Sequence, residues 1–354
     1  MLKKRITLLE LGGTIAMAPN AVGALAPGNS LEEIVASQTS LTKVANITFE
    51  QIQNNDSNNI HPEDWTKLSR RIFQLAGATD AIIITHGTDT MPYTAGAVSL
   101  ALGKGLKIPV IFTGSQRSML EHGSDARINL EHSIETAIKA SEMDIAEVMI
   151  VFDYRILRAS RSVKITEVGF IAFDSPAYPD LASVTANGIW FSPNAKRADQ
   201  SVKFELSPHF NSKILAVDVV PGLDPTLLSS LLSSGKCNGL ILRGHGPGNI
   251  PCEGEYSLLP LIKEATQNLN IPILITTKIF AGRTHLDRYE PGYLAQAAGA
   301  IPTSDLTSTM VQVKLMWVLA QGFGSLAELS QIINTNTVGE LSPEVTMKPR
   351  AINN

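Results

Sequence analysis

The stretch AIIITHGTDT, residues 81–90, decides the fold. Its first half is a continuous apolar run rich in isoleucine, which predicts a strand buried on both faces of a parallel sheet. Its second half, HGTDT, places two hydroxyls, a carboxylate and an imidazole directly after that strand. In open α/β sheets, ligands bind beyond the carboxyl ends of the strands. We therefore expect a functional loop here, on a doubly wound α/β fold.

A plainer interpretation of HGTDT is that Asp89 or Thr90 caps the helix predicted for 91–102. We expect one of them to do so, but the run holds more polar groups than a cap requires, which favours function. A metal site from His86 and Asp89 is the weaker interpretation, because no second histidine or cysteine stands nearby. The sequence also lacks the GxSxG and HExxH patterns of serine and zinc hydrolases.

Strand and helix patterns alternate on both sides of this stretch. Repeated strand–helix units predict a parallel sheet covered by helices on both faces. The strands expected before the break are 6–11, 81–85, 109–113 and 148–152, with helices at 62–76, 91–102 and 125–140. After the break we expect strands at 214–219, 239–242 and 271–276, and helices at 225–234, 256–267, 305–320 and 325–333. The predicted class is α/β, with a doubly wound, mostly parallel sheet in a larger N-terminal domain and a second, smaller α/β domain.

The length and composition fit a two-domain globular enzyme. The 354 residues suffice for about two domains. Prolines and mixed charge interrupt the pattern at 187–212, so we predict an N-terminal domain at 1–190, a linker at 191–212 and a C-terminal domain at 213–354. Apolar residues make up 44% of the chain, which excludes a disordered protein. The formal charge of −4 leaves no basic excess for phosphates, so we expect no nucleic-acid partner.

The N-terminus imitates a signal peptide, because MLKKR precedes an apolar stretch at 6–18. Glu10 interrupts that stretch, and cleavage after Ala18 would remove a glycine turn that has functional character. No stretch reaches the length of a membrane helix, so we expect no membrane partner. The two cysteines, Cys237 and Cys252, form neither a disulfide framework nor a CxxC pattern. A reduced, cytoplasmic setting is therefore expected.

Polar groups also follow other predicted strands. Gly12-Gly13-Thr14 comes directly after the first strand, where glycines allow a sharp turn and a close approach of ligand. A threonine hydroxyl held there acts as a nucleophile when a base or cation activates it. The alternative is an ordinary strand-to-helix turn, and by itself the short motif favours that alternative. No nucleotide-binding glycine pattern is present.

Three further segments carry weaker signals. Asp56-Ser57-Asn58 and Gly114-Ser115-Gln116 each fit turn chemistry as well as a site. Lys164 lies in an extended apolar pattern, where it is either a solvated edge-strand lysine or a group that helps to deprotonate a hydroxyl near Asp89. The glycine-rich loop at 243–248 lines a second pocket, makes a subunit contact or is a plain loop.

These motifs together resemble the L-asparaginase family. LGGTIA at 11–16, DSN at 56–58, THGTDTM at 85–91 and TGSQ at 113–116 match in order and spacing. RILRASRSVKITEVGFIAFDSP at 155–176 and LRGHGPGN at 242–249 are similar to the cytoplasmic type I branch. The resemblance implies hydrolysis of asparagine to aspartate and ammonia, without a metal or organic cofactor. It also implies a homodimer or homotetramer with active sites near a subunit interface.

The resemblance assigns catalytic roles residue by residue. Thr14 matches the family's nucleophile, while Thr88, Asp89 and Lys164 match its second catalytic group. An amide is a poor electrophile, so an activated hydroxyl and a polarised carbonyl are what the chemistry requires.

The resemblance also assigns the binding of a small amide substrate. Asp56, Ser57 and Asn58 match the loop that holds the α-groups of the substrate. Ser115 matches a position whose backbone lies beside the scissile amide.

The chain departs from the family pattern at three places. Leu11 replaces a usual threonine, and Asn58 replaces a small hydroxyl residue. The lid segment at 19–28 has no tyrosine, and Ala24 stands where the family carries one. A missing phenol removes a proton partner and a ring that excludes water. Two alternatives therefore stay open: a hydrolase of a different amide, and a non-catalytic amino-acid-binding protein. A tRNA-dependent amidotransferase subunit shares the motifs, but normally carries a further N-terminal domain.

Overall fold

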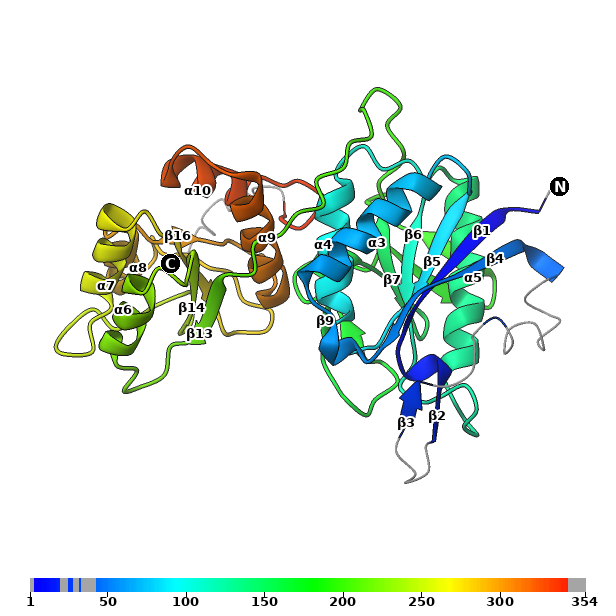
Figure 1. The fold of residues 1–354 in the computed structure, drawn as a ribbon, viewed down its shortest axis with the longest axis horizontal. Helices are drawn as coiled ribbons and strands as arrows, with labels where there is room; N and C mark the ends of the chain where they lie inside the picture. Colours follow the sequence, from blue (N-terminus) through cyan, green and yellow to red (C-terminus); the bar gives the residue numbers. More distant parts are fainter. Residues whose placement is uncertain (1–2, 20–24, 28–31, 33–42, 343–354) are drawn as a thin grey trace, which may run out of the picture.

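The computed structural model describes residues 3–19, 25–27, 32 and 43–342. It has two α/β domains side by side, the larger one formed by the N-terminal half of the chain (Figure 1). An eight-stranded sheet forms the centre of the N-terminal domain, in the order β12-β11-β8-β7-β6-β5-β1-β4. The five strands from β7 to β4 are parallel, whereas β8, β11 and β12 extend the sheet in antiparallel fashion. The predicted class, a mostly parallel α/β sheet with a second smaller domain, is confirmed.

The N-terminal domain combines the strands of its large sheet with small hairpins and covering helices. Its sheet strands are β1 (Arg5–Gly12), β4 (Asn46–Asn55), β5 (Ala81–Thr85), β6 (Val110–Thr113), β7 (Val148–Phe152), β8 (Arg155–Arg158), β11 (Ala182–Thr185) and β12 (Gly188–Phe191). Two small hairpins pair β2 (Met17–Pro19) with β3 (Leu25–Pro27), and β9 (Val163–Lys164) with β10 (Phe173–Asp174). The helices are α3 (Pro62–Leu75), α4 (Met91–Leu102) and α5 (Ala126–Glu142), with short 3-10 turns η1 (Thr14–Ala16), η2 (Ser57–Asn59) and η3 (Ala159–Arg161).

Helices cover both faces of the large sheet. Alternate side chains of the buried strands point to opposite faces, so Leu8 packs on the α5 side and Leu9 on the side of α3 and α4. The strand β5 is buried along its whole length, as its apolar run predicted. This packing holds the carboxyl ends of the parallel strands at one rigid edge, where the loops after β4, β1, β5 and β6 emerge.

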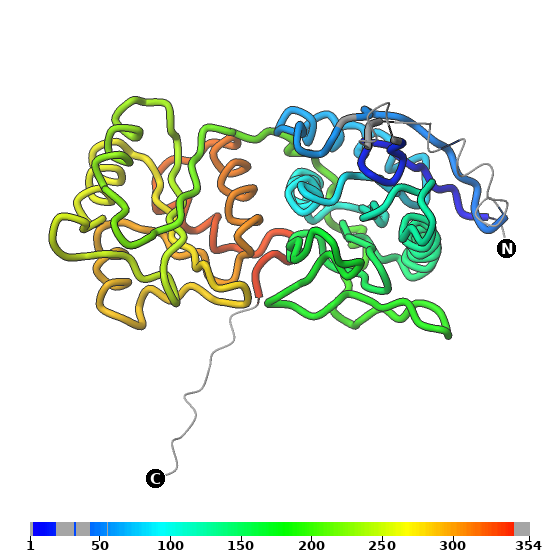
Figure 2. The backbone as a smooth tube through the Cα atoms, turned by 90° about the horizontal axis from the view of Figure 1, so that it is seen from below, coloured from blue at the N-terminus to red at the C-terminus, as the bar shows by residue number. Residues whose placement is uncertain are grey.

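The C-terminal domain has a four-stranded parallel sheet in the order β13-β14-β15-β16. Its strands are β13 (Ile214–Asp218), β14 (Gly239–Gly244), β15 (Ile273–Thr277) and β16 (Ile301–Pro302). Its helical elements are α6 (Pro225–Ser233), α7 (Leu259–Lys263), the π-helical turn η4 (Glu264–Asn268), α8 (Glu290–Ala297), α9 (Ser308–Gln321) and α10 (Leu326–Asn334). The helices α4 and α9 face each other across the domain boundary. Figure 2 shows the segment that connects the two domains crossing from one to the other.

Several sequence expectations differ from the structure in detail. The break expected to begin at 187 is wrong for its first residues, because β11 and β12 form a hairpin that continues the large sheet to Phe191. The helix expected at 256–267 begins only at Leu259 and passes into η4. Helix α8 was not expected, since Pro291 and Gly292 in its first turn have the appearance of a loop. None of the helices in the described part of the chain is long and apolar enough to span a bilayer.

Candidate active site

Four loops meet at the carboxyl edge of the large sheet, each following one of the adjacent strands β4, β1, β5 and β6. Glycines allow the contact. A Cβ atom on Gly13 would lie 2.5 Å from the Gly87 backbone nitrogen, and one on Gly87 would lie 2.5 Å from Ser57 Oγ. A Cβ atom on Gly114 would collide with the His86 carbonyl oxygen. The strand order therefore brings all four predicted loops into direct contact.

Thr14 stands at the turn that follows β1. Gly12 and Gly13 have φ angles of 93° and 96°, a region that residues with side chains rarely adopt. The turn leaves Thr14 half-buried at the start of η1, beside the loop that carries Thr88. After this turn, β2 pairs with β3, and Ala24 of the lid segment lies outside the described residues.

Lys164 joins the second group of predicted catalytic residues. Its Nζ donates to Thr88 Oγ1 at 2.8 Å and to Asp89 Oδ1 at 2.6 Å. Thr88 is buried, the Lys164 side chain is 16% exposed and the Asp89 side chain is 55% exposed. An ammonium group that donates to a hydroxyl oxygen stabilises negative charge developing on that oxygen. The three side chains can therefore prepare Thr88 to accept or deliver a proton.

Gln116 completes the surroundings of the Thr88 hydroxyl. Thr88 Oγ1 donates to Gln116 Oε1 at 3.3 Å. The side-chain nitrogen Nε2 of Gln116 in turn donates to the backbone carbonyl oxygens of Gly169 and Thr166. The hydroxyl of Thr88 thus lies between an ammonium donor and an amide acceptor. TGSQ belonged to the motif set, but nothing in the sequence distinguished Gln116 from a turn residue.

Asp125 holds the loop that carries Gln116. Its carboxylate accepts the backbone N–H groups of Gln116 at 2.9 Å and of Arg117 at 3.0 Å, and the side-chain amide of Asn129 at 3.0 Å. The side chain of Asn129 also donates to the Gly114 carbonyl. Asp125 and Asn129 were missed by the sequence reasoning. An aspartate before the first residue of α5 has the pattern of an ordinary helix cap, although it makes no cap within that helix.

The predicted binding loop is the 3-10 turn η2. The Asp56 carboxylate accepts the N–H of Asn58 at 2.9 Å, which is the turn chemistry expected as the alternative. Ser57 is buried against Gly87, whereas Asp56 and Asn58 are exposed. Thr90 stands at the N-cap position of α4, but its Oγ1 donates to the Ser57 carbonyl and makes no capping hydrogen bond to the helix. The expected cap is therefore confirmed in position, since Thr90 is the N-cap residue, whereas its side chain links two loops instead of capping.

Ser115 and His86 have structural contacts. Ser115 is buried, and its hydroxyl donates to the Arg117 carbonyl. The Nδ1 atom of His86 lies 2.7 Å from the Gly87 carbonyl, and its Nε2 atom lies 2.8 Å from Thr94 Oγ1. Because a carbonyl only accepts, Nδ1 carries the proton and Nε2 accepts from the hydroxyl. Burial lowers the pKa of His86 to about 4 against the opposing effect of the Gly87 contact, so the ring is neutral near pH 7.

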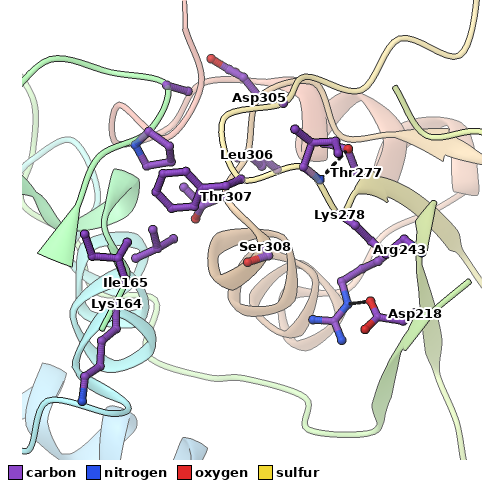
Figure 3. A pocket seen from close by; sticks show the side chains of 16 residues that line it. Lys164, Ile165, Asp218, Arg243, Thr277, Lys278, Asp305, Leu306, Thr307 and Ser308 are labelled. Atoms are coloured by element: carbon purple, nitrogen blue, oxygen red, sulfur yellow. Dashed lines mark hydrogen bonds and ion pairs between the residues drawn. The ribbon is translucent and has the colours of Figure 1, made fainter. Parts of the chain in front are cut away.

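A cavity of about 630 Å³ opens beside Lys164, between the two domains (Figure 3). Its opposite wall includes Asp218, Arg243 and Asp305 of the C-terminal domain. Of the glycine-rich loop at 243–248, only Arg243 lines this cavity, and it pairs with Asp218 at 2.8 Å. Within the described ranges, no three histidine, cysteine or acidic side chains gather as metal ligands would.

Comparisons with known proteins agree on one family. The family model for the asparaginase N-terminal domain matches residues 5–197, and the model for the glutaminase/asparaginase C-terminal domain matches residues 213–333. The L-asparaginase of Thermococcus kodakarensis is 32% identical over 96% of this chain and 99% of its own length. A glutamyl-tRNA(Gln) amidotransferase subunit from Methanothermobacter thermautotrophicus is 30% identical over 89% of this chain and 72% of its own length.

Solved structures give the same result. The thermostable L-asparaginase from Thermococcus kodakarensis superposes with a TM-score of 0.86 over 96% of this chain and 99% of that chain, at 32% identity. L-asparaginase I from Vibrio cholerae superposes with a TM-score of 0.84 over 97% of this chain and its own full length, at 28% identity. With both family models matched in order along the fold, the chain belongs to the asparaginase family and is a hydrolase of amide C–N bonds.

Proposed function

We propose that this protein hydrolyses L-asparagine to L-aspartate and ammonia through an ester formed on Thr14. The observation that carries the proposal is the double contact of Lys164 with Thr88 and Asp89, next to the loop of Thr14. Two hydroxyls from adjacent strands then stand beside one amide, as a two-step hydrolysis requires. The family membership and the L-asparaginase relatives support the choice of reaction.

In the first step, the Thr14 oxygen attacks the side-chain carbonyl carbon of asparagine. The carbon–nitrogen bond breaks, the hydroxyl proton goes to the leaving nitrogen, and ammonia departs. Thr14 remains as an ester of the aspartyl group. Backbone N–H groups of the glycine turns are suited to stabilise the oxyanion that forms, because they are held rigidly at this edge.

In the second step, a water molecule attacks the ester carbon and the bond to Thr14 breaks. The proton of that water passes by way of the Thr88 hydroxyl, which the Lys164–Asp89 pair supports, to the Thr14 oxygen as the ester bond breaks. Aspartate leaves, and Thr14 recovers its hydroxyl proton. Asp89, which is half-exposed, also suits the α-ammonium of the substrate, and Ser57 suits its α-carboxylate. Asp56, Asn58 and the backbone at Ser115 complete the binding loops.

The test is ammonia release from asparagine by the purified protein. Thr14→Val removes the nucleophile and is expected to abolish turnover, whereas Thr14→Ser keeps a hydroxyl and is expected to retain part of it. Both variants should unfold at the wild-type temperature. Unchanged ammonia release by the folded Thr14→Val variant would overturn the proposal.

A second candidate is hydrolysis of a different amide. The similarity to the glutamyl-tRNA(Gln) amidotransferase subunit favours it, because that relative covers nearly the whole chain. One methylene between asparagine and glutamine is worth only about 1–3 kcal/mol of discrimination, so pocket shape decides between them. Ammonia release from glutamine or another amide, but none from asparagine, would select this candidate.

We also propose that the enzyme works as a homodimer or homotetramer in a reducing, cytoplasmic compartment. Both cysteines, Cys237 and Cys252, are free, and tyrosine, phenylalanine and isoleucine side chains are exposed at positions 279–293 of the C-terminal domain. Exposed apolar side chains of this kind suit a contact between subunits. Light scattering coupled to gel filtration measures the assembly, and a mass equal to one chain would contradict it.

A further inference from the structure

We propose that Arg161 and Asp305 form a positioning pair through which the C-terminal domain places Lys164. The inference rests on the role of Lys164 in the proposed reaction and adds a function for two residues outside the site. The geometry points to it because the segment that carries Lys164 lies outside the large sheet, and Arg161 holds it to the C-terminal domain in addition to its packing on the N-terminal core.

Lys164 does not belong to the large sheet. That sheet includes β8, which ends at Arg158, and the chain then turns through η3 into β9. The strand β9 has two residues, and among the described residues it pairs with β10 alone, in a separate hairpin. After it, exposed apolar side chains occupy the loop at 165–171. The hairpin is tied to the N-terminal domain through β10, because Phe173 packs in the core and its carbonyl accepts from Arg155. A two-residue pairing of this kind gives β9 little stability of its own, so contacts on its other side also matter for the position of Lys164.

The anchor of this segment is Arg161, three residues before Lys164. Its side chain is fully buried, at 0% exposure. Its Nε donates to the Gly339 carbonyl at 2.7 Å, and one terminal nitrogen donates to Asp305 Oδ2 at 3.0 Å. The other terminal nitrogen donates to Ser342 Oγ at 3.3 Å. All three acceptors therefore come from the C-terminal part of the chain.

Asp305 is built to hold this guanidinium. Burial opposes ionisation of its carboxyl, but hydrogen bonds from Ser342 and the charge of Arg161 hold its pKa below the ordinary value. The side chain stays ionised near pH 7, and the buried cation has a partner. Removing one member of a buried ion pair leaves the other charge uncompensated, which is strongly destabilising. The Arg161–Asp305 pair therefore holds the two domains together at this point.

The consequence is geometric coupling between Asp305 and the ammonium of Lys164. Both residues line the 630 Å³ cavity, and in Figure 3 Lys164 extends toward the N-terminal domain, away from the labelled C-terminal side chains. A shift of η3 moves β9 with it, because only Ser162 and Val163 separate Arg161 from Lys164. The contacts of Lys164 with Thr88 and Asp89 then lengthen, although neither Arg161 nor Asp305 touches the reacting atoms.

A labelling experiment tests the placement of Lys164 without requiring any enzymatic turnover. An amine-acylating reagent is applied to the folded protein, and peptide mass spectrometry compares the labelling rate of Lys164 with that of the exposed Lys236. In the wild type the largely covered, hydrogen-bonded Lys164 should react slowly. Asp305→Asn should raise the rate ratio about tenfold by loosening the segment. Ser342→Ala, which removes one of the three contacts, is the milder variant if Asp305→Asn does not fold.

Two controls separate placement from general damage. Asp218→Asn makes the same chemical change on the wall of the same cavity, but its partner is Arg243 within the C-terminal domain. Leu232→Ala truncates the C-terminal core far from Arg161. Neither variant should change the Lys164 rate ratio. An unchanged ratio in folded Asp305→Asn and Ser342→Ala, or an equal rise in Leu232→Ala, would overturn the proposal.

Steady-state kinetics of the variants test whether Asp305 acts through Lys164. Asp305→Asn should lower kcat about tenfold to a hundredfold and leave KM nearly unchanged, as a misplaced catalytic group does. In the Lys164→Met background the same substitution should have no further effect on kcat. If the decreases in kcat of the two single variants multiplied in the double variant, the result would contradict the coupling of Asp305 and Lys164. The labelling experiment needs no substrate. If the wild type did not hydrolyse amides, the proposed function would be overturned, but the labelling rates would still show whether Asp305 positions Lys164.

Discussion

At the scale of single residues, the site depends on glycines that let loops from adjacent strands touch. Gly13 combines a φ angle of 96° with a backbone contact that leaves no space for a side chain. Alanine there forces apart the loops of Thr14 and Thr88. The position therefore serves the geometry of the two hydroxyls rather than the flexibility of the turn.

We expect Gly13→Ala to lower activity at least about a hundredfold, because a displacement near 1 Å is enough for such a loss. The free energy of unfolding should fall by about 2–4 kcal/mol. Steady-state ammonia release and urea unfolding measure the two effects. Gly77→Ala, at a glycine with open space around it, is the matched control and should change neither.

His86 makes the stability of the site dependent on pH. Its pKa is lowered from 6.5 to about 4 in the folded protein, chiefly by burial. Between these two pH values the histidine is protonated in the unfolded chain but not in the folded chain. The free energy of unfolding therefore decreases as the pH falls from about 6.5 to about 4. The full contribution of this shift is about 3 kcal/mol.

Urea unfolding near pH 7 and near pH 4.5 checks this dependence. The wild type should lose more stability than His86→Gln over that interval, since glutamine does not titrate. Equal losses in the two proteins would show that another group is responsible.

At the scale of elements, the loop after β6 is held by Asp125, the residue directly before α5. The Asp125 carboxylate accepts hydrogen bonds from two backbone N–H groups of that loop, those of Gln116 and Arg117. The side chain of Gln116 in turn contacts the Thr88 hydroxyl. The helix thus supports the site through a carboxylate that makes no catalytic contact itself. Preorganised backbone of this kind reduces the reorganisation needed during reaction.

Asp125→Ala should lower kcat about tenfold or more, because the Gln116 loop loses its acceptors. The free energy of unfolding should fall by about 1–3 kcal/mol, the cost of unpaired buried donors. Asp224→Ala removes an equivalent backbone acceptor at the start of α6, far from the site, and should leave kcat unchanged. A kcat loss of similar size in both variants would refute a specific role for Asp125.

The elements also show what a single sequence can and cannot predict. The strand at 81–85 and the helix at 91–102 match β5 and α4 residue for residue, because buried apolar runs and proline positions are local signals. The contact of Lys164 with Thr88 joins residues 76 positions apart and rests on the resemblance, not on any local pattern. Arg161 and Asp125 escaped notice, because their partners become known only once the chain is folded.

At the scale of the whole molecule, the two domains are packed through α4 and α9. Gly96 on α4 leaves room for Met310 of α9, and a Cβ atom there would lie 3.2 Å from the methionine sulfur. Trp65 of α3 also packs edge-on against Phe210, with ring centroids 5.3 Å apart. Together with the Arg161–Asp305 pair, these contacts make the C-terminal domain part of the structure that holds the site.

Gly96→Leu should wedge α4 away from α9 and cost about 1–3 kcal/mol by overpacking. Calorimetry should then resolve two transitions where the wild type is expected to show one, since the domains lose their shared interface. Gly77→Leu makes the same change on the surface and should keep a single transition. One unchanged transition in Gly96→Leu would contradict the coupling of the domains.

The division of labour between the two hydroxyls is tested most directly by trapping the intermediate. In the proposed mechanism, Thr88→Val leaves Thr14 able to attack but removes the group that activates water. Mixed with asparagine, this variant should release about one equivalent of ammonia per chain in a burst, as a covalent intermediate accumulates. Mass spectrometry of the quenched protein should find an aspartyl ester on the peptide that contains Thr14. Full turnover by Thr88→Val, or an ester on any residue other than Thr14, would contradict the account.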